Sequence, residues 1–320
     1  MPKVDYRVLV EEDFEQLCDV LARSRACIPH ERKFTPRELR GWILEDPDYH
    51  REGNIVACIG PEIVGFGQVF VEKARLDAGK DDAVVDVDVV PECRNVGIEQ
   101  ELMRWALGHT RSRGVSKARF RVDEINQWKI SLAESSAFME DYRIFDLKRS
   151  GRSPLPIISA PSDMTLERRM MKECSDDYLR LVNDLLNESF VDHHNSVPYP
   201  PERLLTWRDF MEDILMVMLA KVRGTPVGVC ISEDSVRLNL EKGTNSGYIP
   251  VLGVIPAYRK MGAGRAMLAD GMQWLLDRGR DTIYISLVAE NEKAMALYYS
   301  LGFEKSNEAV WYTRPVAENA

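Results

Sequence analysis

The chain has 320 residues, 45% apolar and 29% charged, which is the balance of a soluble globular protein long enough for two ordinary domains. Its net charge of −9, from 42 basic and 51 acidic residues, disfavours nucleic-acid binding, for which a basic surface is typical. Charge from Lys3 onward argues against a signal peptide, and the longest strongly apolar run, residues 214–220, is far shorter than the roughly 20 residues that span a bilayer. We therefore expect a cytoplasmic protein with no membrane or nucleic-acid partner.

The six cysteines form no C-x-x-C pair. This pattern predicts reduced thiols that serve as small apolar residues. We expect no metal site.

An internal repeat organises the chain. A shift of 165 residues superimposes residues 89–138 on residues 254–303 without a gap. The identical positions fall at turns and helix ends: Pro91 and Pro256, Arg94 and Arg259, Gly97 and Gly262, Asn126 and Asn291, Leu132 and Leu297, and Phe138 and Phe303. So long a period indicates a duplicated domain. Residues 150–162 are rich in proline, serine and glycine and are predicted to form a linker, with domains at 1–150 and 163–320.

The second half alternates strand and helix patterns. In chain order we predict a strand at 164–171, a helix at 175–190, strands at 214–222, 227–232 and 247–254, a helix at 265–278, a strand at 282–288 and a helix at 292–301. The first helix should begin at Ser175 or Asp176 and bury Tyr178, Leu181, Leu185 and Leu186. Each domain is thus predicted to be a mixed α/β structure, with a central mixed β-sheet flanked by helices.

A glycine-rich loop joins a strand to a helix in the second half. The strand ends at Val254, and Gly262 and Gly264 lead into the helix. Unpaired N–H groups in a first helical turn attract anions, and glycines permit close approach to the backbone. The loop therefore predicts a phosphate or pyrophosphate site. Ala266 and Met267 depart from the Walker A and Rossmann patterns, respectively.

The complete pattern, V-x-P-x-x-R-x-x-G-x-G-R-A at residues 254–266, resembles the coenzyme A loop of the GNAT acetyltransferases. A second stretch, N-x-x-A-x-x-L-Y-x-x-x-G-F at residues 291–303, resembles the GNAT helix that borders the acetyl-CoA thioester. The resemblance extends over both halves and is similar to the tandem GNAT chains, a group that includes the mycothiol synthases. It implies two tandem GNAT-like domains and an acetyl-CoA-dependent N-acetyltransferase.

The resemblance also implies a binding site for acetyl-CoA (CoA) in the second half. The pantetheine arm would follow the strand end and the pyrophosphate would lie on the loop; the implied residues are Leu252, Gly253, Val254, Arg259, Lys260, Met261, Gly262, Ala263, Gly264, Arg265, Ala266 and Asn291. Backbone N–H groups at the strand end would stabilise the oxyanion that forms during transfer. Tyr298 would protonate the departing thiolate. Leu297 and Leu301 are expected to be core residues instead.

Several residues are candidates for the acceptor side of the reaction. His193, His194, Glu233 and Tyr248 are expected to bind substrate. The general base stays open among these residues and Asp234, with Tyr248 acting through a water. Tyr248 stands where the resemblance places the acidic catalytic residue of the mycothiol enzymes. We expect a primary amine of a small molecule as the acceptor; an amino acid, an amino sugar and a protein N-terminus all fit, as do a monomer and a homodimer.

The first copy of the loop differs at three positions. Glu99 replaces Gly264, Gln100 replaces Arg265, and Ala133 replaces Tyr298. A carboxylate in the loop would crowd the backbone and repel a pyrophosphate. We predict that the first domain is a degenerate, non-catalytic GNAT-like domain. Two alternatives for the whole chain are a non-catalytic acyl-CoA-binding sensor or scaffold, and a protein-binding cleft.

Overall fold

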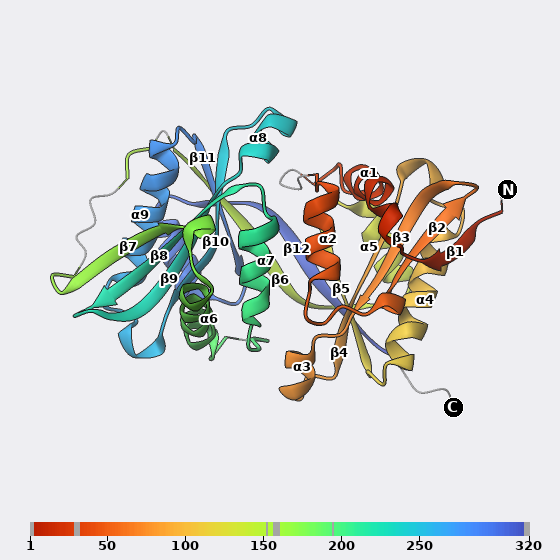
Figure 1. Ribbon diagram of the computed structural model, residues 1–320, viewed down its shortest axis with the longest axis horizontal. Helices are drawn as coiled ribbons and strands as arrows, with labels where there is room; N and C mark the ends of the chain where they lie inside the picture. The colour runs from red at the N-terminus through yellow and green to blue at the C-terminus, as the bar shows by residue number, and fades with distance from the viewer. Residues whose placement is uncertain (1–2, 29–32, 152, 156–160, 194, 317–320) are drawn as a thin grey trace. The chain divides into compact units, whose positions relative to one another are not determined.

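The chain is described by a computed structural model over residues 3–28, 33–151, 153–155, 161–193 and 195–316. It forms two compact units: unit 1 comprises Met1–Arg143 and Glu308–Ala320, and unit 2 comprises Ile144–Asn307. In each unit helices cover a mixed β-sheet, which confirms the predicted fold class (Figure 1).

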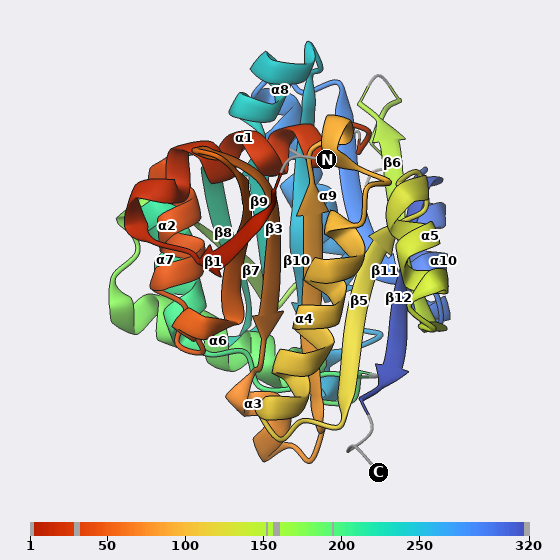
Figure 2. The same cartoon turned by 90° about the vertical axis from the view of Figure 1, so that its right-hand side faces the viewer.

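Unit 1 is built from the first sequence repeat and the end of the chain. Its elements are β1 (Asp5–Val8), α1 (Phe14–Ser24), α2 (Pro36–Leu44), β2 (Asn54–Ile59), β3 (Glu62–Phe70), α3 (Lys73–Asp77), β4 (Asp82–Val89), α4 (Ile98–Ser112), β5 (Lys117–Asp123), α5 (Gln127–Ser135) and most of β12 (Glu304–Pro315). The strand order is β1-β2-β3-β4-β5-β12, and β4 and β5 run parallel. Figure 2 shows α4 lying along β3 and β4.

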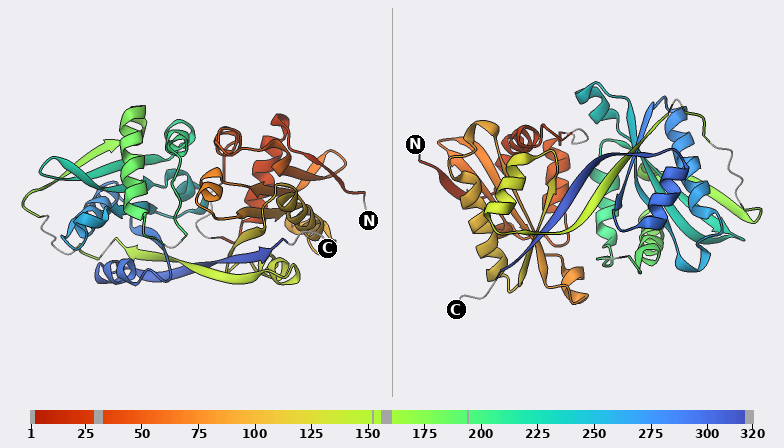
Figure 3. Two further views of the ribbon diagram at one scale, coloured as in Figure 1. Left: turned by 90° about the horizontal axis from the view of Figure 1, so that it is seen from below. Right: turned by 180° about the vertical axis from the view of Figure 1, so that it is seen from behind.

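Unit 2 repeats this plan. Its elements are the second half of β6 (Met139–Ser150), β7 (Met164–Met170), α6 (Asp176–Phe190), α7 (Pro201–Phe210), β8 (Ile214–Val222), β9 (Thr225–Asp234), α8 (Val236–Lys242), β10 (Ser246–Val254), α9 (Ala263–Asp277), β11 (Thr282–Val288) and α10 (Glu292–Ser300). The strand order is β6-β11-β10-β9-β8-β7, and β10 and β11 run parallel. In Figure 3 the green helices α6 and α7 lie on one side of these strands and the blue helices α9 and α10 on the other.

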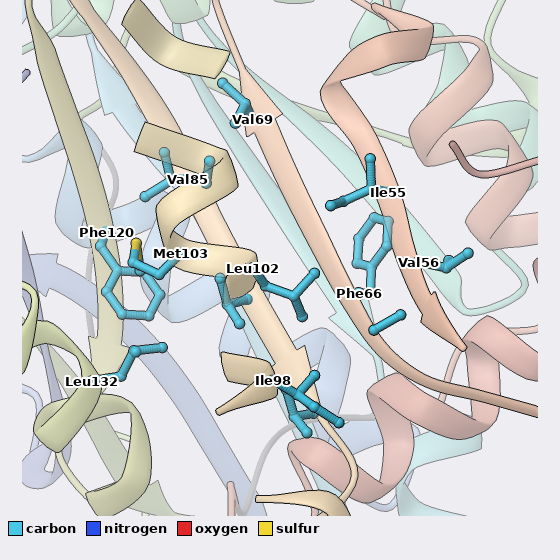
Figure 4. Close-up of a cluster of buried hydrophobic side chains, with 14 of the residues drawn as sticks. Ile55, Val56, Phe66, Val69, Val85, Ile98, Leu102, Met103, Phe120 and Leu132 are labelled. Carbon is cyan, nitrogen blue, oxygen red and sulfur yellow. The ribbon is translucent and has the colours of Figure 1, made fainter. Parts of the chain in front are cut away.

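The core of unit 1 lies between its sheet and the helices. Ile98, Leu102 and Met103 of α4 point toward the strands, where they meet side chains such as Val85 and Phe120 (Figure 4). All five are at most 2% exposed. Burying each such side chain contributes about 1.5–3 kcal/mol relative to exposure. In unit 2, β8 is buried through residues 215–220, which explains the apolar run in the sequence.

The last strand of each repeat belongs largely to the other unit. Residues 144–150 of β6 pair antiparallel with β11 in unit 2, and residues 309–315 of β12 pair antiparallel with β5 in unit 1. Two arginines separated by 165 residues mark the symmetry. Arg149 donates to the Leu301 carbonyl at the end of α10 (2.7 Å), and Arg314 donates to the Ser136 carbonyl at the end of α5 (2.5 Å). The compact units therefore differ from the predicted domains, 1–150 and 163–320, by an exchange of strands.

Most predicted elements of the second half are confirmed. Ser175 caps α6 by accepting a hydrogen bond from the Tyr178 N–H, at 3.2 Å. The predicted apolar face of this helix is confirmed at Leu185 and wrong at Leu181, which is 39% exposed. The buried stripe runs through Leu179, Val182 and Leu185. The element α9 begins at Ala263, two residues before the predicted start. In the part of the chain that the structure describes, no helix combines the length and apolar character needed to cross a membrane.

Candidate functional site

The strands β10 and β11 separate part of the way along unit 2. Their parallel register joins Ser246–Ile249 to Thr282–Ile285 and goes no further among these described strands. On the other side of β10, the register with β9 shifts between Tyr248 and Val251, around Pro250, whose nitrogen cannot donate a hydrogen bond. Past this point the edge of β10 that faces β11 has backbone groups outside the ladder. Such groups need partners, so the splayed edge can pair with an extended ligand.

The loop after β10 has the geometry of an anion site. A short 3-10 turn at Pro256–Tyr258 is followed by Lys260 and Gly262, both with positive φ, at 63° and 88°. Helix α9 begins at the next residue, Ala263, so its unpaired N–H groups face the loop. Lys260 and Met261 are exposed, and Ala266 is buried. The predicted loop residues are thus brought together at one helix N-terminus.

Arg259 braces this loop through its side chain. Its guanidinium donates to the carbonyls of Val254 (3.0 Å) and Ser189 (2.8 Å) and forms an ion pair with Asp192, at 2.5 Å. The ion pair lowers the pKa of Asp192 to about 2. The positive charge of Arg259, which the resemblance implies in acetyl-CoA binding, is therefore offset by a carboxylate, and its side chain holds the strand end against α6. The remaining cation at the start of α9, Arg265, donates to Ser300 of α10.

Gly253 lies in close contact with α6. A Cβ atom at this position would come within 2.7 Å of the Ser189 Cβ and 3.0 Å of the Phe190 ring, so glycine is required for this packing. The Ser189 hydroxyl is buried and has no hydrogen-bond partner. His193 packs edge-on against Phe190, and burial lowers the pKa of His193. His193 is therefore linked to the strand end through Phe190, whereas His194 lies outside the described residues.

Tyr298 and Asn291 lie on and before α10. Tyr298 is 6% exposed. Its burial raises the pKa of its phenol well above the usual range, and the neighbouring Cys230 and Tyr248 raise that pKa further by smaller amounts. The phenol therefore keeps its proton at neutral pH. The Asn291 side-chain oxygen accepts a hydrogen bond from the Ala294 N–H (3.1 Å), so this residue caps α10. A Cβ atom at Gly264 would lie at van der Waals distance from Leu297, so α10 lies beside the start of α9.

A polar row crosses the sheet of unit 2. Glu233 of β9 pairs in register with Tyr248 of β10. The Tyr248 hydroxyl donates to the Ser286 hydroxyl of β11 at 3.0 Å, and the Ser286 hydroxyl donates to the Asp146 carboxylate of β6 at 2.5 Å. Sequence reasoning missed Ser286 and Asp146, because no local motif contains them and Asp146 belongs to the first repeat.

Asp234 does not belong to this row. It is fully buried, and its carboxylate forms ion pairs with Arg278 and Arg280, each at 2.6 Å. Because its two oxygens are paired with arginines at and just after the end of α9, we interpret Asp234 as a structural residue and not as the general base. The described residues also contain no group of three or more His, Cys, Asp or Glu side chains able to hold a metal ion.

The corresponding loop of unit 1 has the same backbone and a different filling. Asn95 and Gly97 have φ values of 62° and 98°, close to those of Lys260 and Gly262. Glu99 turns back into the loop and accepts the Asn95 N–H at 2.7 Å. A carboxylate of the protein thus occupies the position at which the loop can bind an anion.

The splayed strand of unit 1 is also filled by charged side chains. Asp88, the counterpart of Gly253, is fully buried, accepts a hydrogen bond from the Ser24 hydroxyl at 2.7 Å, and pairs with Arg25 and Lys129 at 2.7 and 3.1 Å. Desolvation opposes its ionisation, but these two cations outweigh it and lower the pKa of Asp88 far below its usual value. Charged side chains of the protein thus occupy unit 1 at the positions that correspond to Gly253 and Gly264 of unit 2.

Acetyl-CoA is the group that the sequence implies, and the residues of unit 2 fit it. An anionic pyrophosphate matches the loop of unit 2, because the corresponding loop of unit 1 binds the Glu99 carboxylate through its Asn95 N–H group. An extended arm matches the unpaired edge of β10, and the buried Ser189 hydroxyl beside Gly253 is without a partner for a ligand to satisfy. Unit 1 does not fit acetyl-CoA in this way, because the side chains of Asp88, Lys129 and Glu99 occupy the corresponding strand end and loop.

Comparisons with known proteins agree with this description. The profile of the acetyltransferase (GNAT) family matches residues 15–138 and 179–303, one region in each repeat. Mycothiol acetyltransferase from Rhodococcus erythropolis is 24% identical over 262 residues, covering 78% of this chain and 82% of that protein. Mycothiol acetyltransferase from Propionibacterium freudenreichii is 21% identical over 314 residues, covering 95% and 89%.

Solved structures share the fold. A tandem GNAT protein from the clavulanic acid biosynthesis pathway superimposes with a TM-score of 0.76 at 14% identity, covering 99% of this chain and all of that one. A GCN5-related N-acetyltransferase from Sphaerobacter thermophilus gives a TM-score of 0.68 at 17% identity, covering 99% and 97%. These likenesses confirm the expected tandem arrangement.

Proposed function

The chain belongs to the acetyltransferase (GNAT) family and is an N-acetyltransferase, and we propose that its working site lies in unit 2 and transfers the acetyl group of acetyl-CoA to a primary amine of a small molecule. Members of the family in general use acetyl-CoA. One observation supports the choice of unit 2. Positions 253 and 264 are glycines, whereas the matching positions of unit 1 are the buried carboxylates Asp88 and Glu99.

The donor would be held mainly by backbone. Residues 260–266 would bind the pyrophosphate through N–H groups at the start of α9, and the Lys260 N–H is the counterpart of the Asn95 N–H that binds Glu99. Leu252, Gly253 and Val254 would pair with the extended arm. Arg259 would act by holding the strand end in place, since its side chain already bonds the Val254 carbonyl.

When bound, acetyl-CoA supplies an activated acetyl group as a thioester. The chain's own contribution is polarisation and proton supply. Backbone N–H groups at the splayed end of β10 would stabilise negative charge on the acetyl oxygen, an effect worth about 10²–10³-fold per donor in other enzymes. The buried Ser189 hydroxyl beside Gly253 is a further donor. Tyr298, which burial keeps protonated, would deliver a proton to the departing sulfur.

The acceptor would approach the polar row of the sheet. Glu233 and Tyr248 lie there in register, and His193 lies beyond Phe190 near the strand end. Two of the relatives named above are mycothiol acetyltransferases, which supports a small-molecule acceptor for this chain. The phenol and carboxylate groups of this row suit a polar amine.

A count of acetyl-CoA bound per chain, by native mass spectrometry, tests the proposal. We expect one equivalent for the native chain and none for Gly264→Glu, whose new carboxylate should accept the Lys260 N–H as Glu99 accepts that of Asn95. Gly264→Ala is the control: a Cβ there would lie 3.6 Å from Val254 and 3.9 Å from Leu297, so the fold should tolerate it. Two equivalents, or binding that survives Gly264→Glu, would contradict the assignment to unit 2.

Substitution of Tyr298 separates catalysis from ligand sensing. We expect Tyr298→Phe to bind acetyl-CoA normally and to lower kcat by about 10²-fold, since general acid catalysis typically contributes 10²–10⁴. Unchanged turnover would remove the acid role of Tyr298. Binding without turnover of any amine by the native chain would favour an acyl-CoA sensor or scaffold.

A further inference from the structure

We propose that Tyr248, Ser286 and Asp146 form a proton relay that receives the proton of the acceptor amine, so that the first sequence repeat supplies the final proton acceptor for the site of unit 2. This inference rests on the proposed function. Tyr248 would contact the amine and is the catalytic member, whereas Ser286 and Asp146 act through it and position its proton.

The hydrogen bonds of the row all run in one direction. The Tyr248 hydroxyl donates to Ser286, and Ser286 donates to Asp146. In the proposed relay, the Tyr248 oxygen accepts the proton of the amine as the phenolic proton passes along this bond to Ser286. The chain of donors ends on a carboxylate, which accepts hydrogen bonds when ionised.

Asp146 is held in place on both sides. Its second carboxylate oxygen accepts the Asn307 side-chain amide at 3.2 Å, and its backbone carbonyl accepts the Ser306 hydroxyl at 3.0 Å. It also pairs in register with Ser286 across β6 and β11. These bonds fix the carboxylate toward Ser286, and Asn307 brings no counter-charge that would compete for the proton.

The row lies at the place where the reaction would occur. Tyr248 is in the last part of β10 that pairs with β11, immediately before the strands separate. Tyr248 and Tyr298 are close enough for the charge of one to affect the pKa of the other. Tyr298 would thus serve the leaving sulfur and Tyr248 the attacking nitrogen, from opposite sides of the splayed strands.

The proton balance is complete. The amine nitrogen forms a bond to the acetyl carbon, the carbon–sulfur bond breaks, and the electron pair leaves on sulfur, which takes a proton from Tyr298. The proton lost by nitrogen passes to the Tyr248 oxygen as the phenolic proton moves to Ser286 and the serine proton to Asp146. Solvent then takes the proton of Asp146 and restores that of Tyr298, and no other reactant is needed.

Unit 1 lacks the relay at matching positions. The register pair Ser286 and Asp146 corresponds to Arg121 and Trp311. Besides Tyr298, the titratable groups near Tyr248 among the described residues include Glu233 on β9 and Tyr284 on β11, each paired with it in register. Glu233 is the rival proton acceptor, so the experiment has to distinguish it from Asp146.

The test compares Asp146→Asn with Glu233→Gln, and with Asp141→Asn as a control on an exposed carboxylate of the same strand. Acetylation of D-glucosamine, glycinamide and phenethylamine is measured against pH. We expect Asp146→Asn to lower kcat by about 10²-fold, to leave the KM for acetyl-CoA unchanged, and to move the rising limb of the pH profile to higher pH. Tyr248→Phe should cost about as much, and the double variant little more, because the residues act as one unit.

A second readout is independent of turnover. With tyrosines labelled at Cζ by ¹³C, the Tyr248 signal, assigned through Tyr248→Phe, should shift in Asp146→Asn and stay in place in Asp141→Asn. An active native enzyme with Asp146→Asn as active as the control, or a loss seen with Glu233→Gln alone, would overturn the relay and leave the proposed function standing. A folded native chain that acetylates none of the probes would overturn both.

Discussion

The two glycine loops of this chain share a backbone and differ in what fills them. In unit 1 and unit 2 the loop has a similar pair of positive φ values, and an arginine, Arg94 or Arg259, donates to the carbonyl that ends the preceding strand at 3.0 Å. In unit 1, however, the Glu99 carboxylate lies in the loop, and the buried Asp88, paired with Arg25, stands at the position of Gly253. If acetyl-CoA binds in unit 2 as proposed, the shared backbone shape is not sufficient for binding, and the side chains beside the loop decide it.

The exchange of last strands extends the comparison to the whole chain. The last strand of each repeat pairs with the sheet of the other unit. On that strand an arginine, Arg149 or Arg314, donates a hydrogen bond to a backbone carbonyl at the end of a helix of the same unit. In unit 2 the exchanged strand also brings Asp146 to the polar row, whereas in unit 1 it brings Trp311 over the Arg119 guanidinium at 4.4 Å. The first repeat therefore contributes to unit 2 even though its own loop is occupied by Glu99, because its last strand, β6, completes the sheet of unit 2.

The largest effect should come from removing the exchanged strand. A fragment of residues 163–307 lacks β6, so β11 becomes an unpaired edge, and the buried Leu147 and Arg149 are lost. We expect this fragment to be largely unfolded by circular dichroism and to bind no acetyl-CoA. The matched fragment, residues 144–307, contains all of unit 2 and should fold. Equal folding and equal binding of the two fragments would show that β6 is dispensable.

A smaller effect is expected from the buried charges of unit 1. Asp88→Ala leaves Arg25 and Lys129 without their fully buried partner, and breaking such a pair costs about 3–5 kcal/mol. Asp86 contacts the same two cations but is 28% exposed, so Asp86→Ala should cost clearly less. Urea unfolding of the full chain measures both. If the two variants were equally stable, the buried carboxylate would not be what holds this cluster.

The same cluster sets a dependence of stability on pH. The pKa of Asp88 is lowered in the folded state, so its contribution to the free energy of unfolding is complete above the ordinary aspartate value of 3.8. It is lost as the pH falls below that value toward the lower folded pKa. We expect the native chain to lose stability between about pH 4 and pH 2 and Asp88→Ala to lose less over this range, measured by unfolding at each pH. Parallel curves for the two proteins would contradict this account.

Local pattern made much of the fold predictable. Strand and helix positions in the second half, the Ser175 cap and the loop at 254–266 follow from short-range sequence signals. The exchanged strands did not, because β6 and β12 have the same strand pattern whichever sheet they join. The relay was missed for the same reason, since Asp146 and Ser286 are 140 residues apart and meet only in the folded sheet. Glu99 was expected to crowd the backbone, whereas a Cβ at the matching Gly264 has ordinary contacts and the carboxylate itself fills the loop.

The smallest effect is expected from Glu99→Gly, which tests directly whether the loop carboxylate separates unit 1 from unit 2. Glu99→Gly removes one hydrogen bond, to the Asn95 N–H, and leaves the Asp88, Arg25 and Lys129 cluster intact. We expect a change in stability of about 1 kcal/mol and still one acetyl-CoA per chain by native mass spectrometry. A second equivalent in this variant would mean that the loop carboxylate alone closes unit 1.

Three substitutions together copy unit 2 into unit 1: Asp88→Gly, Glu99→Gly and Lys129→Ala match Gly253, Gly264 and Ala294. Asp88 and one of its two cations, Lys129, are removed together, so the triple variant should be more stable than Asp88→Ala alone. If filling is what separates the two units, this variant should bind a second acetyl-CoA without gaining turnover, because Ala133 still stands in place of Tyr298. One equivalent, in a protein that remains folded, would show that Arg25 or the strand itself also excludes the ligand.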